Sequence, residues 1–214
     1  REILPEHKKV LVLICGANMD FAQLQRVVRG ARIASKTRCY LRFEIDERAG
    51  TLHRLLSELR TKANIIEFQY GKTDQDKAWP VIGLENEETS LCDLYAAWKE
   101  SGLAFEDLTG EIDVEFRAFP FKPALVEFPL FLEVEFSERA GALADFLGKA
   151  SNLSDLVYFD YQYSGERVGR ALIGFDFGSA QARENFLRFT ETARDATRKF
   201  KALSESQMKR ILAR

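Results

Sequence analysis

The order of apolar and polar residues predicts strands and helices along most of the chain. Leu41, Phe43 and Ile45 alternate with polar residues, as in a strand with one buried face. After a turn, apolar residues recur at helical spacing and form one stripe, as on a helix that covers a sheet. The stripe consists of Leu52, Leu55, Leu56 and Leu59.

This pattern occurs twice in the chain. The sequence Glu-Arg-Ala-Gly at 47–50 returns at 138–141, an offset of 138 − 47 = 91 residues. At that offset residues 40–84 match residues 131–175 without a gap, with 12 identities in 45 positions. Each copy is predicted to run strand, helix, strand, strand, helix, strand, so the fold class is α+β.

Prolines mark the weak points of this pattern. Pro80 falls in the third strand of the first copy, where it cannot donate to a ladder, so we expect a bulge there or a strand that begins at Val81. Pro120, Pro123 and Pro129 lie between the copies and mark a boundary. We therefore divide the chain into residues 1–37, 38–119 and 120–214.

The segment before the first copy is different in character. Residues 10–14 form an apolar run typical of a buried strand, and a helix is predicted from Asp20, with Leu24, Val27 and Val28 on its apolar face. A lone strand and helix do not make a domain, so we expect them to pack against the repeats or against another part of a larger protein. The start at Arg1, without methionine, suggests a piece cut from a longer chain.

Composition excludes several classes of protein. The formal charge is −2 and both signs are interspersed, which argues against nucleic acid or an anionic membrane as partner. The apolar run at 10–14 is too short to span a bilayer. Three distant cysteines, Cys15, Cys39 and Cys92, argue against a disulfide framework and a metal site, and favour a reducing cytoplasm.

Catalytic residues are scarce. His7 and His53 have no nucleophile or metal partner at a suitable spacing, and we interpret both as surface histidines. Glu44 and Glu47, repeated at 135 and 138, are expected to be solvated acids rather than a catalytic pair. No catalytic and no metal-binding residue is predicted in this chain.

The turn that holds Glu-Arg-Ala-Gly is a better candidate for binding. Gly50 and Gly141 permit close approach of a ligand, and the helix that follows begins with unpaired N–H groups at its positive end. A free amino acid could place its carboxylate there and its side chain against Phe68 and Tyr70, or against Phe159 and Tyr161. The alternative is that the glycines only allow the turn and the aromatic residues are core.

In this order, the duplicated turn and the Phe-x-Tyr strands at 68–70 and 159–161 resemble the C-terminal regulatory region of biosynthetic threonine dehydratase. Residues 105–109, Phe-Glu-Asp-Leu-Thr, are similar to the segment that closes that family's first subdomain. The resemblance implies two tandem ferredoxin-like, ACT-like βαββαβ subdomains. Cys15-Gly-Ala-Asn resembles the end of the pyridoxal-phosphate catalytic domain, where Cys15 would lie against the pyridine nitrogen.

The resemblance also implies a function. The family deaminates threonine to 2-oxobutanoate and ammonia, a step of isoleucine biosynthesis, and is regulated by isoleucine and valine. This chain lacks the Ser-x-Lys-x-Arg motif and the glycine-rich phosphate loop, so we expect no cofactor and no activity in it alone, and a homo-oligomer in the cytoplasm. The alternative is a free-standing ACT-like module for oligomerisation or amino-acid sensing.

The effector residues follow from the two turns and their strands. They are expected to be Arg48, Ala49, Gly50, Thr51, Leu52, Phe68, Tyr70, Arg139, Ala140, Gly141, Ala142, Leu143, Phe159 and Tyr161. One departure from the family is that Gly71 and Gln162 stand where an arginine commonly follows the tyrosine.

Overall fold

The structure is a computed structural model that describes residues 21–48, 50–86, 90–137, 154–163, 168–192 and 198–213. The helices are α1 (Phe21–Ala34), α2 (Thr51–Leu59), α3 (Leu91–Glu100), α4 (Ile112–Glu115), α6 (Ala180–Thr192) and α7 (Glu205–Leu212), with a 3-10 turn η1 (Pro123–Leu125). The strands are β1 (Arg38–Asp46), β2 (Asn64–Gly71), β3 (Lys77–Ala78), β4 (Val81–Glu85), β5 (Ala104–Asp107), β6 (Leu130–Ser137), β7 (Asp155–Gln162), β8 (Val168–Asp176) and β9 (Arg198–Ala202). The predicted α+β class is confirmed.

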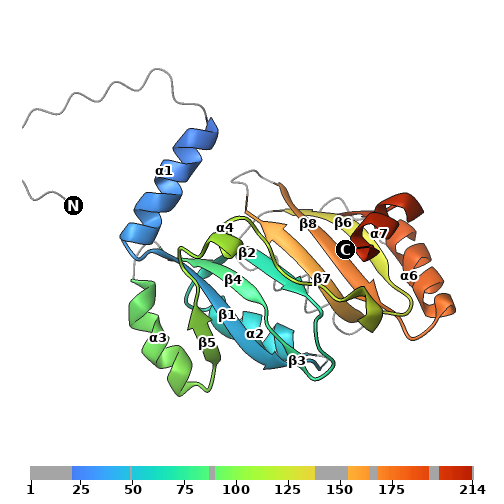
Figure 1. The fold of residues 1–214 in the computed structure, drawn as a ribbon, viewed down its shortest axis with the longest axis horizontal. Coiled ribbons are helices and arrows are strands. Elements are labelled where there is room, and N and C mark those ends of the chain that lie inside the picture. The colour runs from blue at the N-terminus through green and yellow to red at the C-terminus, as the bar shows by residue number, and fades with distance from the viewer. Residues whose placement is uncertain are drawn as a thin grey trace, which may run out of the picture.

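The nine strands of the described residues form one antiparallel sheet, which runs across the molecule in Figure 1 with α1 standing off one end. The order is β3-β1-β4-β2-β7-β8-β6-β9, and β5 also pairs with β1. From β5 inward the first copy contributes β5, β1, β4 and β2. From β9 inward the second copy contributes β9, β6, β8 and β7. In both copies the order from the outer edge inward is therefore fourth, first, third and second strand.

The two halves join where β2 pairs with β7, a contact that we call the seam. Phe68 lies opposite Tyr161, and Tyr70 lies opposite Phe159. Gln69 lies opposite Asp160, and these two positions are equivalent at the offset of 91 residues. The halves are therefore related by an approximate two-fold axis that passes between Gln69 and Asp160.

Local structure in the first copy agrees with the sequence pattern. In β1 the predicted inward residues Leu41 and Phe43 are buried, whereas Arg42 is exposed. The third strand does begin again at Val81, since β3 and β4 keep one register against β1 and are separated by Trp79 and Pro80. The Pro80 carbonyl still accepts a bond from the β1 ladder, which shows that only the donor was lost.

One face of the sheet carries the main core, and this core continues across the seam. Buried residues of α2 and α3, such as Leu56 and Trp98, pack on strands of the first copy. Phe68 and Phe159 meet edge to face across the seam, with ring centroids 4.8 Å apart. The two copies therefore share one hydrophobic interior on this face.

The opposite face repeats a finer detail in both copies. Each has a register shift, at Ile65/Glu67 in β2 and at Leu156/Tyr158 in β7. Beside each shift lies a glycine, Gly83 or Gly174, where a Cβ would come within 3.0 Å of a neighbouring side chain. The neighbours are the equivalent pairs Tyr40 with Glu67 and Phe131 with Tyr158, so the duplication preserved a packing arrangement as well as a sequence.

The connection between the copies crosses this second face. It includes α4, then Arg117 with a left-handed φ of 56°, then a stretch from Ala118 to η1. At Gly71 an added Cβ would lie 2.2 Å from the Pro120 carbonyl oxygen. This close passage explains why glycine stands at the position that Gln162 occupies in the second copy.

Of the two terminal helices, the sequence pattern predicted α1 but not α7. α1 forms as expected, but its apolar residues Leu24, Val27 and Val28 are 47%, 57% and 41% exposed. α7 was missed, although Ser204 and Gln207 form a capping box at its start. The expected strand at 10–14 and the first helix of the second copy lie outside the described residues.

Replacing Gly71 by alanine is expected to destabilise the protein by about 1–3 kcal/mol, because the methyl group has to displace the backbone at Pro120. Urea unfolding followed by circular dichroism measures the change. Gly178→Ala is the matched control, since a Cβ there meets no described atom within 4 Å. Equal stabilities for the two variants would contradict the packing described for this crossing.

Candidate functional site

The structure describes the first predicted turn at Gly50 and at the start of α2. Gly50 is left-handed, with φ 85°, and the space beside it is open, since no described atom lies within 4 Å of the position that a Cβ would occupy. It caps α2 without a side-chain hydrogen bond. The Thr51 amide donates to Arg48, and the Gly50 carbonyl accepts from Arg54, which starts the helix. Gly50 is exposed, whereas Thr51 and Leu52 at the beginning of α2 are half-buried.

The glutamate of the repeated motif is tied to the tyrosine of the Phe-x-Tyr strand. The Tyr70 hydroxyl donates to the Glu47 carboxylate at 2.5 Å. Burial raises the pKa of Glu47, and the bond from Tyr70 opposes that shift. The expectation of a solvated acid fits Glu44, which is exposed, but Glu47 is half-buried and its carboxylate is bound to Tyr70 of β2.

The aromatic residues of both copies lie in the shared core. Phe68 and Phe159 are fully buried, and Tyr70 and Tyr161 are only 4% and 3% exposed. Leu52 is half-buried and packs against the same cluster. The structure thus brings the two predicted sets together at the seam, with their rings facing one another rather than an open cavity.

The remaining predicted site residues are placed unevenly. Arg48 is exposed, and Thr51 is half-buried at the first position of α2. Ala49, Cys15 and residues 139–143 lie outside the described residues. The second turn and the expected contact of Cys15 with pyridoxal phosphate therefore stay predictions.

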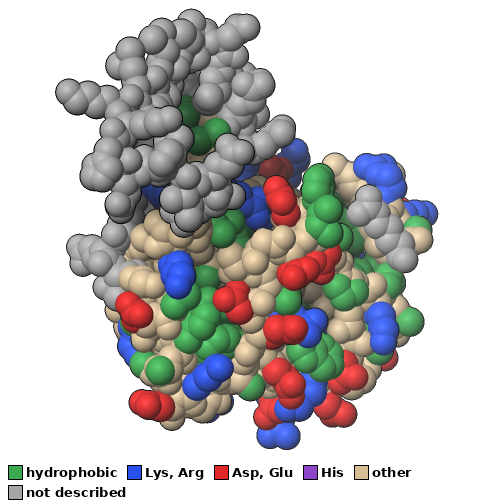
Figure 2. All heavy atoms as spheres, turned by 60° about the vertical axis from the view of Figure 1, so that its left-hand side comes forward, with side chains coloured by type: hydrophobic (Ala, Val, Ile, Leu, Met, Phe, Trp, Pro, Cys, Tyr) green, Lys and Arg blue, Asp and Glu red, His purple; other side chains and the backbone are tan. Residues whose placement is uncertain are grey.

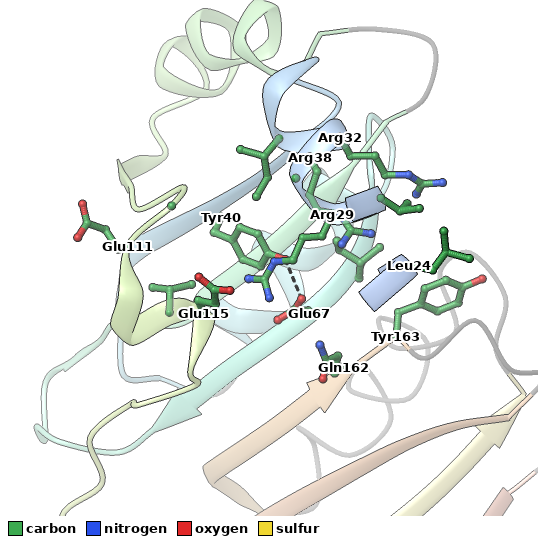
Figure 3. A pocket seen from close by; sticks show the side chains of 16 residues that line it. Leu24, Arg29, Arg32, Arg38, Tyr40, Glu67, Glu111, Glu115, Gln162 and Tyr163 are labelled. Atoms are coloured by element: carbon green, nitrogen blue, oxygen red, sulfur yellow. Dashed lines mark hydrogen bonds between the residues drawn. The ribbon is translucent and has the colours of Figure 1, made fainter. Parts of the chain in front are cut away.

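A larger cavity, not predicted from the sequence, lies between α1, the sheet and α4 (Figure 3). Its volume is about 780 Å³, within the range of ~300–1,000 Å³ common for small-molecule pockets. We call it the α1 cavity. Charged and polar side chains line it together with apolar ones, and the polar set includes Arg29, Arg32, Arg38, Tyr40, Glu67, Glu111, Glu115, Gln162 and Tyr163.

At the floor of the α1 cavity, buried polar groups are paired with one another. The Tyr40 hydroxyl donates to Glu67 at 2.7 Å, and the Arg117 guanidinium donates to the other Glu67 oxygen at 3.0 Å. The Arg29 guanidinium lies 4.9 Å above the Tyr40 ring. Burial, and then the charge of Glu67, raise the pKa of Tyr40, so its hydroxyl stays a donor.

The equivalent place in the second copy is filled. Phe131 and Tyr158 stand where the first copy has Tyr40 and Glu67. Phe119 and Phe121 of the connection cover them, with ring centroids 5.2 Å and 5.6 Å from that of Tyr158. The two halves thus differ on this face: one holds a polar cavity and the other an aromatic cluster.

Arg117 joins the two copies at the seam. Its guanidinium donates to Glu67 and to the Phe68 carbonyl of the first copy, and to the Asp160 carboxylate and Tyr161 carbonyl of the second. Burial lowers the pKa of Arg117, and the charge of Glu67 opposes the shift. Gln69 donates to the backbone carbonyl of Val114 in α4. The two residues at the two-fold axis, Gln69 and Asp160, are therefore both bound by the connection between the copies.

Two findings in the described part of the chain concern metal ligands and nucleophiles. No group of three or more potential metal ligands occurs within it. Cys39 is buried, which raises its pKa to about 12, so it is a poor nucleophile at neutral pH. None of the helices in these residues is long and apolar enough to cross a membrane. Charges of both signs are interspersed on the face in Figure 2.

Comparison with known proteins identifies the family. Residues 29–116 and 128–210 match the C-terminal regulatory domain of threonine dehydratase, which covers both halves of the sheet. The chain belongs to this family. The suspected resemblance is confirmed.

Several threonine dehydratases are similar in sequence. The biosynthetic L-threonine dehydratase of Burkholderia multivorans is 25% identical over 189 residues, which make up 86% of this chain and 37% of that protein. The threonine dehydratase of Nicotiana attenuata is 28% identical over 182 residues, 83% of this chain and 30% of that protein. The chain therefore spans about a third of the length of these relatives.

Replacing Arg117 by methionine is expected to lower the free energy of unfolding by about 2–4 kcal/mol, because the buried Glu67 carboxylate loses its cation. Chemical denaturation measures this loss. Glu67→Gln in the same background should recover part of it. Arg170→Met, which removes an exposed pair with Glu135, should cost under about 1 kcal/mol.

The raised pKa of Glu47 predicts a pH dependence of stability. A carboxyl whose folded pKa is raised stabilises the fold below its unfolded pKa, and that contribution is lost as pH rises through the folded pKa. The stability of Glu47→Gln relative to the parent should therefore increase from about pH 4 to pH 7. The stability of Asp46→Asn relative to the parent should instead fall as pH rises, and this change should lie below about pH 5, because Lys77 lowers the pKa of Asp46 below its unfolded value. Thermal unfolding at several pH values checks both signs.

Proposed function

We propose that this chain is the regulatory region of a threonine dehydratase and that it senses a branched-chain amino acid, isoleucine or valine. The family match over both halves of the sheet carries the proposal. In this proposal deamination of threonine to 2-oxobutanoate and ammonia, with pyridoxal phosphate, takes place elsewhere in the parent protein. The chain supplies the control of that step of isoleucine biosynthesis.

We further propose that residues 38–119 and 120–214 are ACT-like subdomains. They would follow residues 1–37, the tail end of a pyridoxal-phosphate catalytic domain and a connecting helix. The support is the strand order. In each half the fourth strand lies beside the first, then come the third and the second, as in a ferredoxin-like unit. Oligomer formation through the remaining surface belongs to the same proposal, because most soluble assemblies are symmetric homo-oligomers.

The turn at Gly50 is the proposed place of an effector carboxylate. Its open left-handed glycine and the start of α2 favour an anion there. Arg48, close by and exposed, would add positive charge. The corresponding residues of the second copy, Arg139 to Leu143, are proposed by the repeat alone, and the two turns differ at Thr51 and Ala142.

Titration of the chain with isoleucine and with valine by calorimetry tests the proposal. Binding with a dissociation constant below about 1 mM is expected, which corresponds to roughly −4 kcal/mol or better. Gly50→Asp places a carboxylate in the turn and should weaken binding at that site, with melting temperature as the control for folding. Absence of heat with both amino acids, in a folded chain, would favour the alternative of a purely structural module.

A further inference from the structure

We propose that the α1 cavity is a second binding site, for a free aliphatic α-amino acid, separate from the turn at Gly50. None of the described residues at 47–52 lines this cavity. The inference rests on the proposed function in one respect: the first ligand to be tested, isoleucine, is taken from it. Its argument comes from the charges, the buried polar atoms and the apolar walls of the cavity itself.

Both signs of charge meet inside the cavity. Figure 3 shows Arg29, Tyr40, Glu67 and Glu115 directed toward the same part of it. A zwitterion can place its carboxylate by the guanidinium and its ammonium by the carboxylates. A polyanion such as a nucleotide would be repelled by the carboxylates. An amine without a carboxylate would leave the guanidinium without an anionic partner. A free amino acid carries one group for the guanidinium and one for the carboxylates.

One buried donor in the cavity wall lacks an acceptor. The Nε of Arg38 is buried and has no hydrogen-bond partner among the described residues, although Nη2 of the same side chain reaches Glu85 at 3.4 Å. The Nε has no exposed surface, so it is not itself a contact for a ligand. The Arg38 side chain nevertheless lines the cavity and adds positive charge to its wall.

The rest of the wall suits an aliphatic side chain, and the acidic group at the floor is held in place. Leu24, Val28, Ile33, Ile66 and Val114 supply apolar surface. The acidic group at the floor is fixed before any ligand arrives, because Glu67 is held by Tyr40 and Arg117. Prepositioned groups reduce the entropy lost on binding.

The site should occur once per chain. In the second copy the equivalent surface is covered by Phe119 and Phe121. A ligand in the α1 cavity would bridge α1, the sheet and α4, so it would restrain α1 against the seam. α1 makes few contacts of its own with the sheet, since its apolar residues Leu24, Val27 and Val28 are exposed. Binding would thus be transmitted to the segment that leads into the regulatory domain.

Hydrogen exchange with isoleucine locates the ligand. In the whole chain carrying both Gly50→Asp and Gly141→Asp, which block the two proposed turns, isoleucine is expected to slow exchange in α1 and α4. Arg29→Gln in this background should weaken binding by about 10–100-fold, the loss expected for a hydrogen bond to a charged group. Arg188→Gln, an exposed arginine on α6, is the matched control and should leave the affinity unchanged.

Ligands that lack one charge test the recognition of a zwitterion. 3-Methylpentanoate has no ammonium and 2-methylbutylamine has no carboxylate, and each should bind at least about tenfold more weakly than isoleucine. Protection confined to the two turns, residues 47–54 and 138–145, of the parent chain, with an unchanged affinity in Arg29→Gln, would overturn this inference and leave the proposed function intact. No binding of isoleucine or valine to the parent chain would overturn both.

Discussion

Each half of the sheet ends in a strand, β2 or β7, whose outer N–H and C=O groups need partners, and the two strands supply each other. Unpaired edges of this kind invite aggregation, so the seam removes a liability from both halves at once. It also merges the aromatic residues of the repeat into one core. Arg117 adds charge-assisted bonds to both strands from the side opposite that core. The connection crosses this junction through Arg117, and the α1 cavity lies beside it, since Gln162 of β7 lines that cavity.

Duplication kept some features of the module and released others. Gly83 and Gly174 stayed because a side chain at either position would collide with its neighbours. Tyr40 and Glu67 diverged from Phe131 and Tyr158, since the surroundings of the two pairs differ. The connection lies over the second pair and leaves the first open beneath α1. Divergence is therefore concentrated where the connection breaks the symmetry.

Much of the fold was predictable from local pattern. The period of apolar residues gave β1 and α2, and the chemistry of Pro80 gave the restart at Val81. The seam was not predictable, because strand pairing between copies depends on contacts far apart in sequence. For the same reason the burial of Glu47 and the α1 cavity were missed. α7 does carry a local signal, the capping box of Ser204 and Gln207, which would have predicted its start.

The covalent link between the copies has an evolutionary consequence. If the seam joined two identical chains, every substitution would occur on both sides of the two-fold axis, and Asp160 would face another aspartate instead of Gln69. Within one chain each side mutates alone. A single substitution can then place one acid at the axis, and Arg117 of the same chain pairs with it. Tandem fusion thus allows different residues at equivalent positions of the two copies, which a symmetric dimer of identical chains cannot have.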